Sequence, residues 1–487
     1  MNGGLFMRGS KLPKLTNEQS TIYYLSDSQN LVILGAAGSG KSLVATYRAL
    51  YLEEKHPNAK ILLLTMNHEI GQQIEQSIMR QRPKSNIRVS TMYSYCQELM
   101  RNYYPDKIKF TSVTIKENKQ AIDDAINSVQ EEMPNETLWN KISEDGDNSF
   151  FANEITWMQE NGIPVSELGR KTYLTIPRIG RGSERISGQQ RKIMYEVYCK
   201  YYEKRHHINP EKLFQFNDIY SFVVNLRIPD AEKSGFIIID EVQDFTPVMF
   251  QALNNIIAPD GYWCVVGDVS QNIFGQRLSW SSLGLENVRK YTLSKNYRNS
   301  YEIGKLAESM LATGYFDNKS ADFVAPIPSP ENKCGLPKLR HFKGDYSEII
   351  HVLRDKLRNE SVSVITMDFR ESAQLKKQFE KAGIPFTDNI NNYSEDRVYL
   401  QTINKVKGLE FDTVLIFCLD SANFRDNTDI IDKYSKTLKA DLMVDEDKAI
   451  VAKRIYVAIT RARKNLIMYY KKTPLDFLFN KELIESV

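Results

Sequence analysis

The sequence lacks several features that would place it in a class directly. Its five cysteines lie far apart with no paired spacing, which argues against a zinc ribbon, a redox pair or a disulfide framework and fits a reducing compartment. No apolar stretch approaches the roughly 20 residues that span a membrane. The N-terminal sequence MNGGLFMRGSKLPKL has no apolar core of signal-peptide length. These absences lead us to expect a soluble cytoplasmic protein with no membrane partner.

The sequence also has no large excess of positive or negative charge and no visible internal repeat. The formal net charge is +3 over 487 residues, so a nucleic-acid partner would need a local basic patch rather than a basic surface overall. Hydrophobic residues make up 42% and charged residues 26%, as in an ordinary globular protein. The length is too great for one core and predicts roughly two to four domains.

A glycine-rich segment is the first positive signal. Residues 35–42 (GAAGSGKS) match the pattern G-x-x-x-x-G-K-[ST] directly after the apolar run LVIL at 31–34; the alternative is a strand-to-helix turn that binds nothing. Backbone N–H groups of such a loop surround phosphate oxygens, and the next helix directs its positive end at them. We expect Lys41 to reach the β- and γ-phosphates of a nucleoside triphosphate and Ser42 to ligate Mg²⁺. The candidate binding residues are Gly35, Ala36, Ala37, Gly38, Ser39, Gly40, Lys41 and Ser42.

Two blocks of the sequence have the pattern of α/β cores. In each block, apolar runs typical of strands buried on both faces alternate with helical patterns. The first block predicts strands at 31–34, 61–65, 236–239 and 264–266, with helices at 43–55 and 69–80. The second predicts strands at 362–366, 398–402, 414–417 and 466–470, with helices at 370–382 and 448–460. The simplest architecture is two doubly wound sheets in tandem.

A pair of carboxylates follows one of these strands. Asp240 and Glu241 come directly after the apolar residues FIII. This places both at the C-terminal end of a central strand, where ligands bind in open α/β sheets. Downstream of a phosphate loop, Asp240 is expected to hold Mg²⁺ and Glu241 to polarise the attacking water.

The string DEVQD at 240–244 resembles the DExQD motif of superfamily 1 helicases of the UvrD/Rep/PcrA type. The phosphate loop and five further strings occur in the family's order: LTNEQ at 15–19, VGDVSQ at 266–271, LSKNYRNS at 293–300, TINKVKGLEF at 402–411 and YVAITRA at 456–462. The resemblance implies an α/β fold of two tandem RecA-like P-loop motor domains with a mostly helical insertion in the first. It also implies ATP and Mg²⁺ as cofactors.

By the same resemblance, individual residues acquire roles around ATP. Gln19 would read the adenine edge, Tyr297 would stack on the base, and Glu410 would lie near the ribose. Gln271 would sense the γ-phosphate. The two remaining residues, Arg298 and Arg461, would be arginine fingers, each of which can be worth 10³–10⁵ in rate. With fingers on one sheet and the phosphate loop on the other, ATP would lie in the cleft between them, and closure would move one domain against the other.

The spacing of the motifs predicts the domain boundaries. Residues 1–95 and 216–290 would form the first RecA-like domain, and 96–215 a helical accessory insertion that binds DNA. Residues 291–487 would form the second domain, with small insertions near 311–345 and 420–450, the latter as a solvated loop or short helices. Because only about 100 residues separate Arg298 from Thr402, we expect the large accessory subdomain of long family members to be missing or reduced.

The nucleic-acid contacts are less clearly marked. Segment 170–212 has eleven Lys/Arg against four Asp/Glu, and its arginines alternate with tyrosines in a pattern that suits phosphate contact and base stacking. The alternative is a solvated helix with its tyrosines in a core. The chain also departs from the family at Tyr93, Phe274, Gln276 and Asn404, all on the nucleic-acid side, with Trp280 as a candidate replacement for stacking. The residues of the basic segment are Arg178, Arg181, Arg185, Arg191, Tyr173, Tyr195, Tyr198, Tyr201 and Tyr202.

Three functions remain open at this stage. The leading hypothesis is an ATP-dependent helicase or translocase that moves 3′→5′ on single-stranded or tailed duplex DNA. The second is a DNA-sensing ATPase that regulates a partner, such as a repair factor or a nuclease of a phage-defence system. The third, a nucleotide-gated binding protein without catalysis, is disfavoured by the intact Glu241, Gln271 and both arginines.

Overall fold

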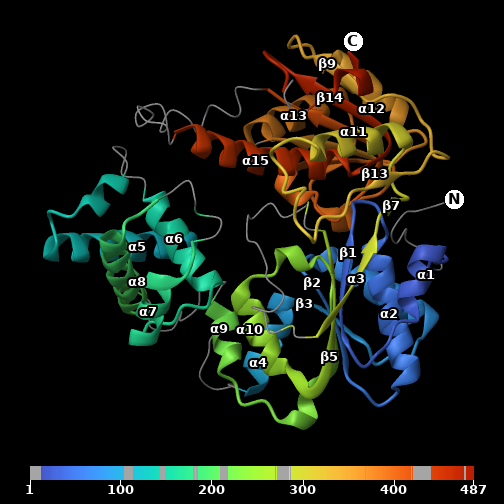
Figure 1. Ribbon diagram of the computed structural model, residues 1–487. Coiled ribbons are helices and arrows are strands. Elements are labelled where there is room, and N and C mark those ends of the chain that lie inside the picture. The colour runs from blue at the N-terminus through green and yellow to red at the C-terminus, as the bar shows by residue number, and fades with distance from the viewer. Residues whose placement is uncertain are drawn as a thin grey trace.

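The computed structural model describes most of the chain. The described residues are 12–103, 113–142, 148–178, 181, 185–208, 218–268, 270, 285, 287–367, 369–417, 419–420, 440–475 and 479–486. Two parallel sheets form its core, one above the other in Figure 1, and a group of helices stands to one side of the lower sheet.

The first sheet has six parallel strands in the order β3-β2-β4-β5-β1-β6. The strands are β1 (Asn30–Gly35), β2 (Ile61–Thr65), β3 (Arg88–Thr91), β4 (Ser234–Ile239), β5 (Ile257–Gly267) and β6 (Val288–Leu293). Alternate residues of the apolar runs enter different cores, as in β4, where Phe236 and Ile238 face one way and Ile237 and Ile239 the other. Burial on both faces explains why these strands read as continuous apolar runs.

Helices cover both faces of this sheet (Figure 1). On one face lie α1 (Asn17–Tyr23), α2 (Lys41–Lys55) and α3 (His68–Gln81), which share a core with one set of strand residues. On the other lie α4 (Met92–Tyr103), α9 (Asp218–Val224) and α10 (Pro247–Ile256). The doubly wound arrangement brings the C-terminal ends of β1, β2 and β4 to one edge, which faces the second sheet.

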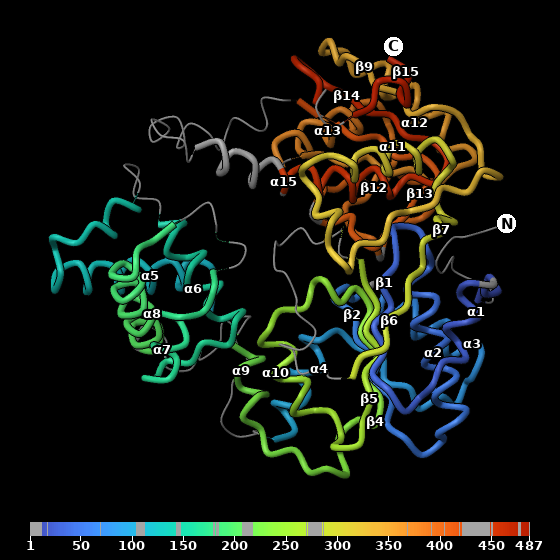
Figure 2. Tube along the Cα trace, viewed as in Figure 1, coloured from blue at the N-terminus to red at the C-terminus, as the bar shows by residue number. Residues whose placement is uncertain are grey.

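Between α4 and α9 the chain forms a helical insertion with its own core, seen apart from the sheets in Figure 2. Its helices are α5 (Ile115–Glu132), α6 (Ser149–Glu160), α7 (Glu167–Thr175) and α8 (Gly188–Ile208), with the 3₁₀ turn η1 (Thr137–Lys141). The insertion core is rich in aromatic side chains, among them Trp139, Trp157 and Tyr198.

The second sheet has seven parallel strands in the order β11-β12-β10-β13-β14-β9-β15. The strands are β9 (Lys338–His341), β10 (Val362–Thr366), β11 (Phe386–Thr387), β12 (Val398–Thr402), β13 (Phe411–Phe417), β14 (Ala462–Tyr470) and β15 (Glu485–Ser486). Helices α11 (Tyr301–Leu311) and α15 (Ala440–Ile459) pack on one face, and α12 (Ser347–Lys356) and α13 (Phe369–Ala382) on the other.

The α/β class with two tandem sheets is therefore confirmed, with corrections in detail. The prediction of a solvated loop or short helices through residue 450 was wrong for 440–450, because α15 already begins at Ala440. The strand-like runs missed five strands of the two sheets, which are short or carry exposed and polar residues: β3, β6, β9, β11 and β15. Among the described residues, no helix combines the length and apolar character needed to cross a membrane.

Candidate nucleotide site between the two sheets

The glycine-rich loop connects β1 to α2 and depends on two glycines in the left-handed region. Gly38 has φ 74° and Gly40, the N-cap of α2, has φ 81°. A Cβ on Gly38 would collide with the Asn296 side chain, and one on Gly40 with Gln19. Both positions therefore need glycine for conformation and for space. The loop curls around the N-terminal end of α2, whose free N–H groups and dipole favour an anion.

Side chains from three segments converge on this loop. Gln19 is almost fully buried, and its Nε2 donates a hydrogen bond to the Ser39 carbonyl oxygen at 2.9 Å. The Lys41 ammonium donates to the carbonyls of Gly35 at 3.1 Å and Ala36 at 3.0 Å. It also lies 3.5 Å from a carboxylate oxygen of Asp268. The loop thus holds a buried cation at its mouth.

Asp240 lies at the end of β4 and is completely buried. Its Oδ1 accepts a hydrogen bond from the Glu241 N–H at 3.1 Å, whereas its Oδ2 has no hydrogen-bond partner among the described residues. Burial and the neighbouring Glu241 raise the pKa of Asp240 to about 7. A hydrogen bond from Ser42 and the charge of Lys41 act in the opposite direction and do not outweigh them. A buried, unpartnered carboxylate oxygen beside a serine hydroxyl is suited to a hard cation.

Glu241 has a left-handed backbone, with φ 56° and ψ 46°. Only one other non-glycine residue among those described, Asn287, has a positive φ. Such strain is characteristic of functional sites, where the surrounding structure holds it. Gln243 donates a hydrogen bond to the Glu241 carboxylate and accepts one from the Asp268 N–H at 3.0 Å.

The Glu241 carboxylate is kept charged by its surroundings. Burial alone would raise its pKa, but the charges of Lys41, Lys407 and Arg461 and the hydrogen bond from Gln243 outweigh burial and lower it. Lys407 and Arg461 come from the second sheet, so the field at Glu241 depends on both halves of the cleft.

The two predicted arginine fingers lie close together on the second-sheet side. Arg461 is 1% exposed, and its guanidinium donates to the carbonyls of Val457 and Leu409. Burial and the charge of Arg298 lower the pKa of Arg461 to about 10. Arg298 forms an ion pair with Glu410, which also pairs with Arg463 at 2.6 Å. The structure thus places Glu410 against two arginines, and its contact with a ribose stays a prediction.

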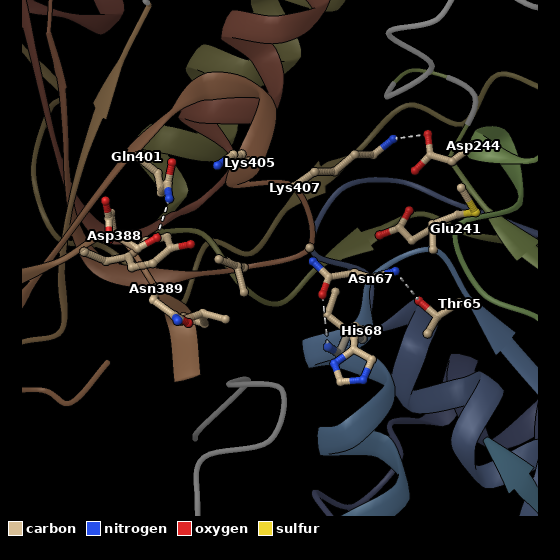
Figure 3. A pocket seen from close by; sticks show the side chains of 16 residues that line it. Thr65, Asn67, His68, Glu241, Asp244, Asp388, Asn389, Gln401, Lys405 and Lys407 are labelled. Atoms are coloured by element: carbon tan, nitrogen blue, oxygen red, sulfur yellow. Dashed lines mark hydrogen bonds and ion pairs between the residues drawn. The ribbon is translucent and has the colours of Figure 1, made fainter. Parts of the chain in front are cut away.

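A cavity of about 650 Å³ opens between the sheets beside this site (Figure 3). Glu241 lines it together with residues 65–68 and 70 of the first half and residues 388–390, 405 and 407–409 of the second. Lys407 extends across the cavity to Asp244, with Nζ 2.6 Å from Oδ1. Gly408, at φ 80°, lies so close to Ile70 that a Cβ there would collide with it. The sequence contained Asp244 and Lys407 within recognised strings, but not the contact between them.

Comparisons with known proteins agree with this geometry. Residues 15–292 match the family described as the UvrD/REP helicase N-terminal domain. The chain belongs to the UvrD/REP helicase family. Residues 387–473 match the UvrD-like helicase C-terminal domain.

Two curated relatives of this family are named ATP-dependent DNA helicase PcrA. The protein from Staphylococcus epidermidis is 21% identical over 411 residues, covering 77% of this chain and 50% of the relative. The protein from Staphylococcus aureus is 21% identical over 407 residues, covering 77% and 51%. This chain spans about half the length of the curated relatives it matches. A solved C-terminal domain of a possible DNA helicase from Lactobacillus plantarum WCFS1 is 16% identical and covers 39% of this chain and 98% of its own, but its TM-score of 0.27 supports no argument.

Several of the UvrD/REP-type positions can be placed only in part. Tyr297 is half-buried, and its N–H donates to the Gly38 carbonyl at 3.0 Å, so it adjoins the phosphate loop. Gln271 lies outside the described residues, as do Phe274, Gln276 and Trp280. The roles of these residues stay predictions.

The basic segment 170–212 has a different role from the predicted one. Tyr173, Tyr195, Tyr198 and Tyr201 lie in the insertion core rather than on a stacking surface. Arg178 and Arg181 form ion pairs with the fully buried Glu154. Arg191 donates to the backbone carbonyls of Tyr173 and Ile176. Of the predicted contacts, only Arg185 is clearly exposed. The prediction of a DNA surface was therefore wrong for these tyrosines and for Arg178, Arg181 and Arg191, because their partners hold them in the fold. For Arg185, DNA contact stays a prediction, as does DNA binding by the insertion as a whole.

Proposed function

We propose that this chain is an ATP-dependent DNA helicase or translocase that hydrolyses ATP between its two sheets and moves 3′→5′ on single-stranded DNA. The observation that carries the proposal is the arrangement of the cleft. A phosphate loop and two carboxylates on one side face two arginines on the other, and the charge of one of these arginines, Arg461, helps to lower the pKa of Glu241. This arrangement supplies the positioning and charge stabilisation that phosphoryl transfer requires.

The residues present fit ATP with Mg²⁺. The phosphate loop, Lys41 and the end of α2 would bind the phosphates, with Gln19 and Tyr297 toward the base. Ser42 and the unpartnered Oδ2 of Asp240 would hold the metal. When bound, Mg²⁺ neutralises charge on the β- and γ-phosphates.

Protein groups would then perform the remaining steps. Glu241, kept ionised, would orient the attacking water and accept its proton. Arg298 and Arg461 would stabilise negative charge on the transferred phosphoryl group, with Gln271 as the γ-phosphate sensor. Because Arg461 directly precedes β14 of the second sheet and Arg298 pairs with Glu410 of the same half, hydrolysis would alter the contact between the two halves.

The cavity beside Glu241 supports a track for the nucleic-acid strand. Lys405 and Lys407 line it together with polar side chains from both sheets, and it passes between the two moving halves. A single strand bound there would contact Lys407 and so change the charge environment of Glu241. Single-stranded or tailed duplex DNA is the substrate we infer, with a cytoplasmic location.

A second candidate is a DNA-sensing ATPase that switches a partner, such as a repair factor or a nuclease in a phage-defence system. One observation favours it. Between Arg298 and Thr402 most of the described residues build the second sheet and its helices. The stretch 312–337 between α11 and β9 contains the short strand β8, and β11 and β12 are joined by residues 388–397 alone. The span from Arg298 to Thr402 leaves little chain for an accessory subdomain that would engage a duplex.

One set of assays separates the candidates. ATP hydrolysis is measured with and without single-stranded DNA, and strand displacement on duplexes with a 3′ or a 5′ tail. Lys41→Ala should abolish hydrolysis, whereas Lys200→Ala, on helix α8 of the insertion, should not. Hydrolysis that ignores DNA contradicts the motor. DNA-stimulated hydrolysis without displacement on either duplex contradicts a helicase and favours the translocase or the partner switch, and displacement only from the 5′ tail overturns the stated polarity.

A further inference from the structure

The described chain passes from the first sheet to the second through one short segment, residues 294–300, between β6 and α11. Within it, β7 (Lys295–Asn296) pairs with β8 (Ile327–Pro328). Figure 2 shows this connection rising beside β1, where the phosphate loop lies. The segment carries Tyr297 and Arg298, so its conformation sets where one of the two arginines stands.

Two fully buried asparagines organise this segment. Asn296 and Asn299 are each 1% exposed. Oδ1 of Asn296 accepts hydrogen bonds from the N–H groups of Arg298 at 3.0 Å and Asn299 at 3.1 Å. Its Nδ2 donates to Oδ1 of Asn299 at 2.7 Å. The Asn296 side chain therefore fixes the backbone of Arg298 and is hydrogen-bonded to the side chain of Asn299.

The Asn299 amide continues the network to the other arginine. Its Nδ2 donates to the carbonyls of Thr460, at 3.2 Å, and Ala462, the residues on either side of Arg461. Both N–H bonds of this amide are thus used on backbone flanking Arg461. The reversed amide would direct an oxygen at two carbonyls, so the network admits one orientation.

We propose that Asn299 is a positioning residue that holds Arg298 and Arg461 at a fixed separation, so that they engage the γ-phosphate as one unit. The inference rests on the proposed function, since both arginines act on ATP. Burial and, after it, the like charge of Arg298 lower the pKa of Arg461, and a neutral amide network between the two backbones opposes the repulsion between these charges without adding a charge. Satisfied buried networks of this kind rigidify the groups that they join.

The same segment contacts the phosphate loop. The Tyr297 N–H donates to the Gly38 carbonyl at 3.0 Å, and Asn296 fills the space that a Cβ on Gly38 would need. The network of Asn296 and Asn299 therefore lies between the phosphate loop and the two arginines. Loss of Asn299 should affect the arginines while leaving the loop intact.

The test uses Asn299→Ala and the isosteric Asn299→Asp, which keeps the acceptor toward Asn296 but cannot donate to the two carbonyls. Asn255→Ala is the matched control. Nδ2 of Asn255 also donates hydrogen bonds to two carbonyls, those of Val223 and Leu226, each at 2.8 Å, and these lie away from the nucleotide site. We expect kcat for ATP hydrolysis to fall at least tenfold in both Asn299 variants with KM within threefold. Asn255→Ala should keep kcat within twofold.

A binding measurement makes the test independent of turnover. We expect the Asn299 variants to lose about tenfold in affinity for a non-hydrolysable ATP analogue while their affinity for ADP stays unchanged. Combined with Arg461→Ala, the Asn299 substitutions should add little further loss in kcat, because both act on the same contact. If the wild-type chain does not hydrolyse ATP, the proposed function is wrong. The role of Asn299 is then still tested by the ratio of the affinity for the ATP analogue to the affinity for ADP. The positioning role of Asn299 is overturned if an Asn299 variant unfolds at the same temperature as Asn255→Ala and keeps the wild-type ratio of analogue affinity to ADP affinity. It is also overturned if the losses in kcat from the Asn299 and Arg461→Ala substitutions are fully additive.

Discussion

Glu154 offers the sharpest test of how the insertion is held together. Its carboxylate is fully buried and meets Arg178, Arg181 and the Tyr173 hydroxyl, the last at 2.8 Å. Burial would raise the pKa of Glu154, but these partners outweigh burial and lower it. Glu154→Gln keeps the shape and removes the charge, so two arginines lose their counter-ion.

The expected cost follows from burial. Removing one partner of a buried pair costs about 3–5 kcal/mol. Arg178 and Arg181 are 9% and 13% exposed, so water relieves part of this cost and we expect about 3 kcal/mol. Because the folded-state pKa of Glu154 is lowered, its contribution is complete above the ordinary carboxyl pKa and is lost as the pH falls below it.

Urea unfolding at pH 7, followed by fluorescence, measures the effect. Trp139 and Trp157 lie in the insertion core and report on this part of the chain. Glu203→Gln is the control, since Glu203 is 51% exposed and pairs with Lys200 on one helix, a contact that contributes at most about 0.5 kcal/mol. Equal stability of the two variants would refute the structural role of these arginines, as would tighter salt-dependent DNA binding by Glu154→Gln.

Three further predictions concern other parts of the fold. Lys407→Ala should lower the slope of log affinity against log salt for single-stranded DNA by about one, and an unchanged slope would remove Lys407 from the track. Gly408→Ala should reduce kcat roughly tenfold, because the new Cβ meets Ile70 at a positive φ, and Ile70→Ala should restore part of the rate. Asp27, whose pKa is held at about 2 by Lys55 and His56 against burial, should stabilise the fold above pH 4 and progressively less toward pH 2. Urea titrations of Asp27→Asn at pH 7 and pH 3 should show a difference from wild type that shrinks with acid.

The sheet interiors could be predicted from the sequence because burial on both faces forces a continuous apolar run. The expected strands at 61–65, 362–366 and 398–402 coincide with β2, β10 and β12. Edge and outer strands have no such constraint. β6 has the sequence VRKYTL with mostly exposed or half-buried residues, so its composition does not differ from that of a loop.

The site residues show the same division between local and distant information. The phosphate loop and the DEVQD string are contiguous, so the sequence contains their geometry. Arg178 pairs with Glu154, 24 positions earlier in the chain, and Lys407 pairs with Asp244, 163 positions earlier. These distant partners decide where each side chain lies. A run of arginines and tyrosines has the same pattern whether it faces solvent or a buried carboxylate, and only the tertiary partner decides which.

The place where the chain crosses between the sheets has a mechanical consequence. The crossing leaves from β6, an edge strand, next to β1 and its phosphate loop. β2, which leads to Ile70 and the cavity, lies four positions from β6, or roughly 19 Å at the usual strand spacing, whereas β1 is about 5 Å away. Rotation about the crossing displaces atoms in proportion to their distance from it. If ATP binds at the phosphate loop as proposed and one half rotates about this crossing, a small movement beside β1 would become one about four times larger at the end of β2.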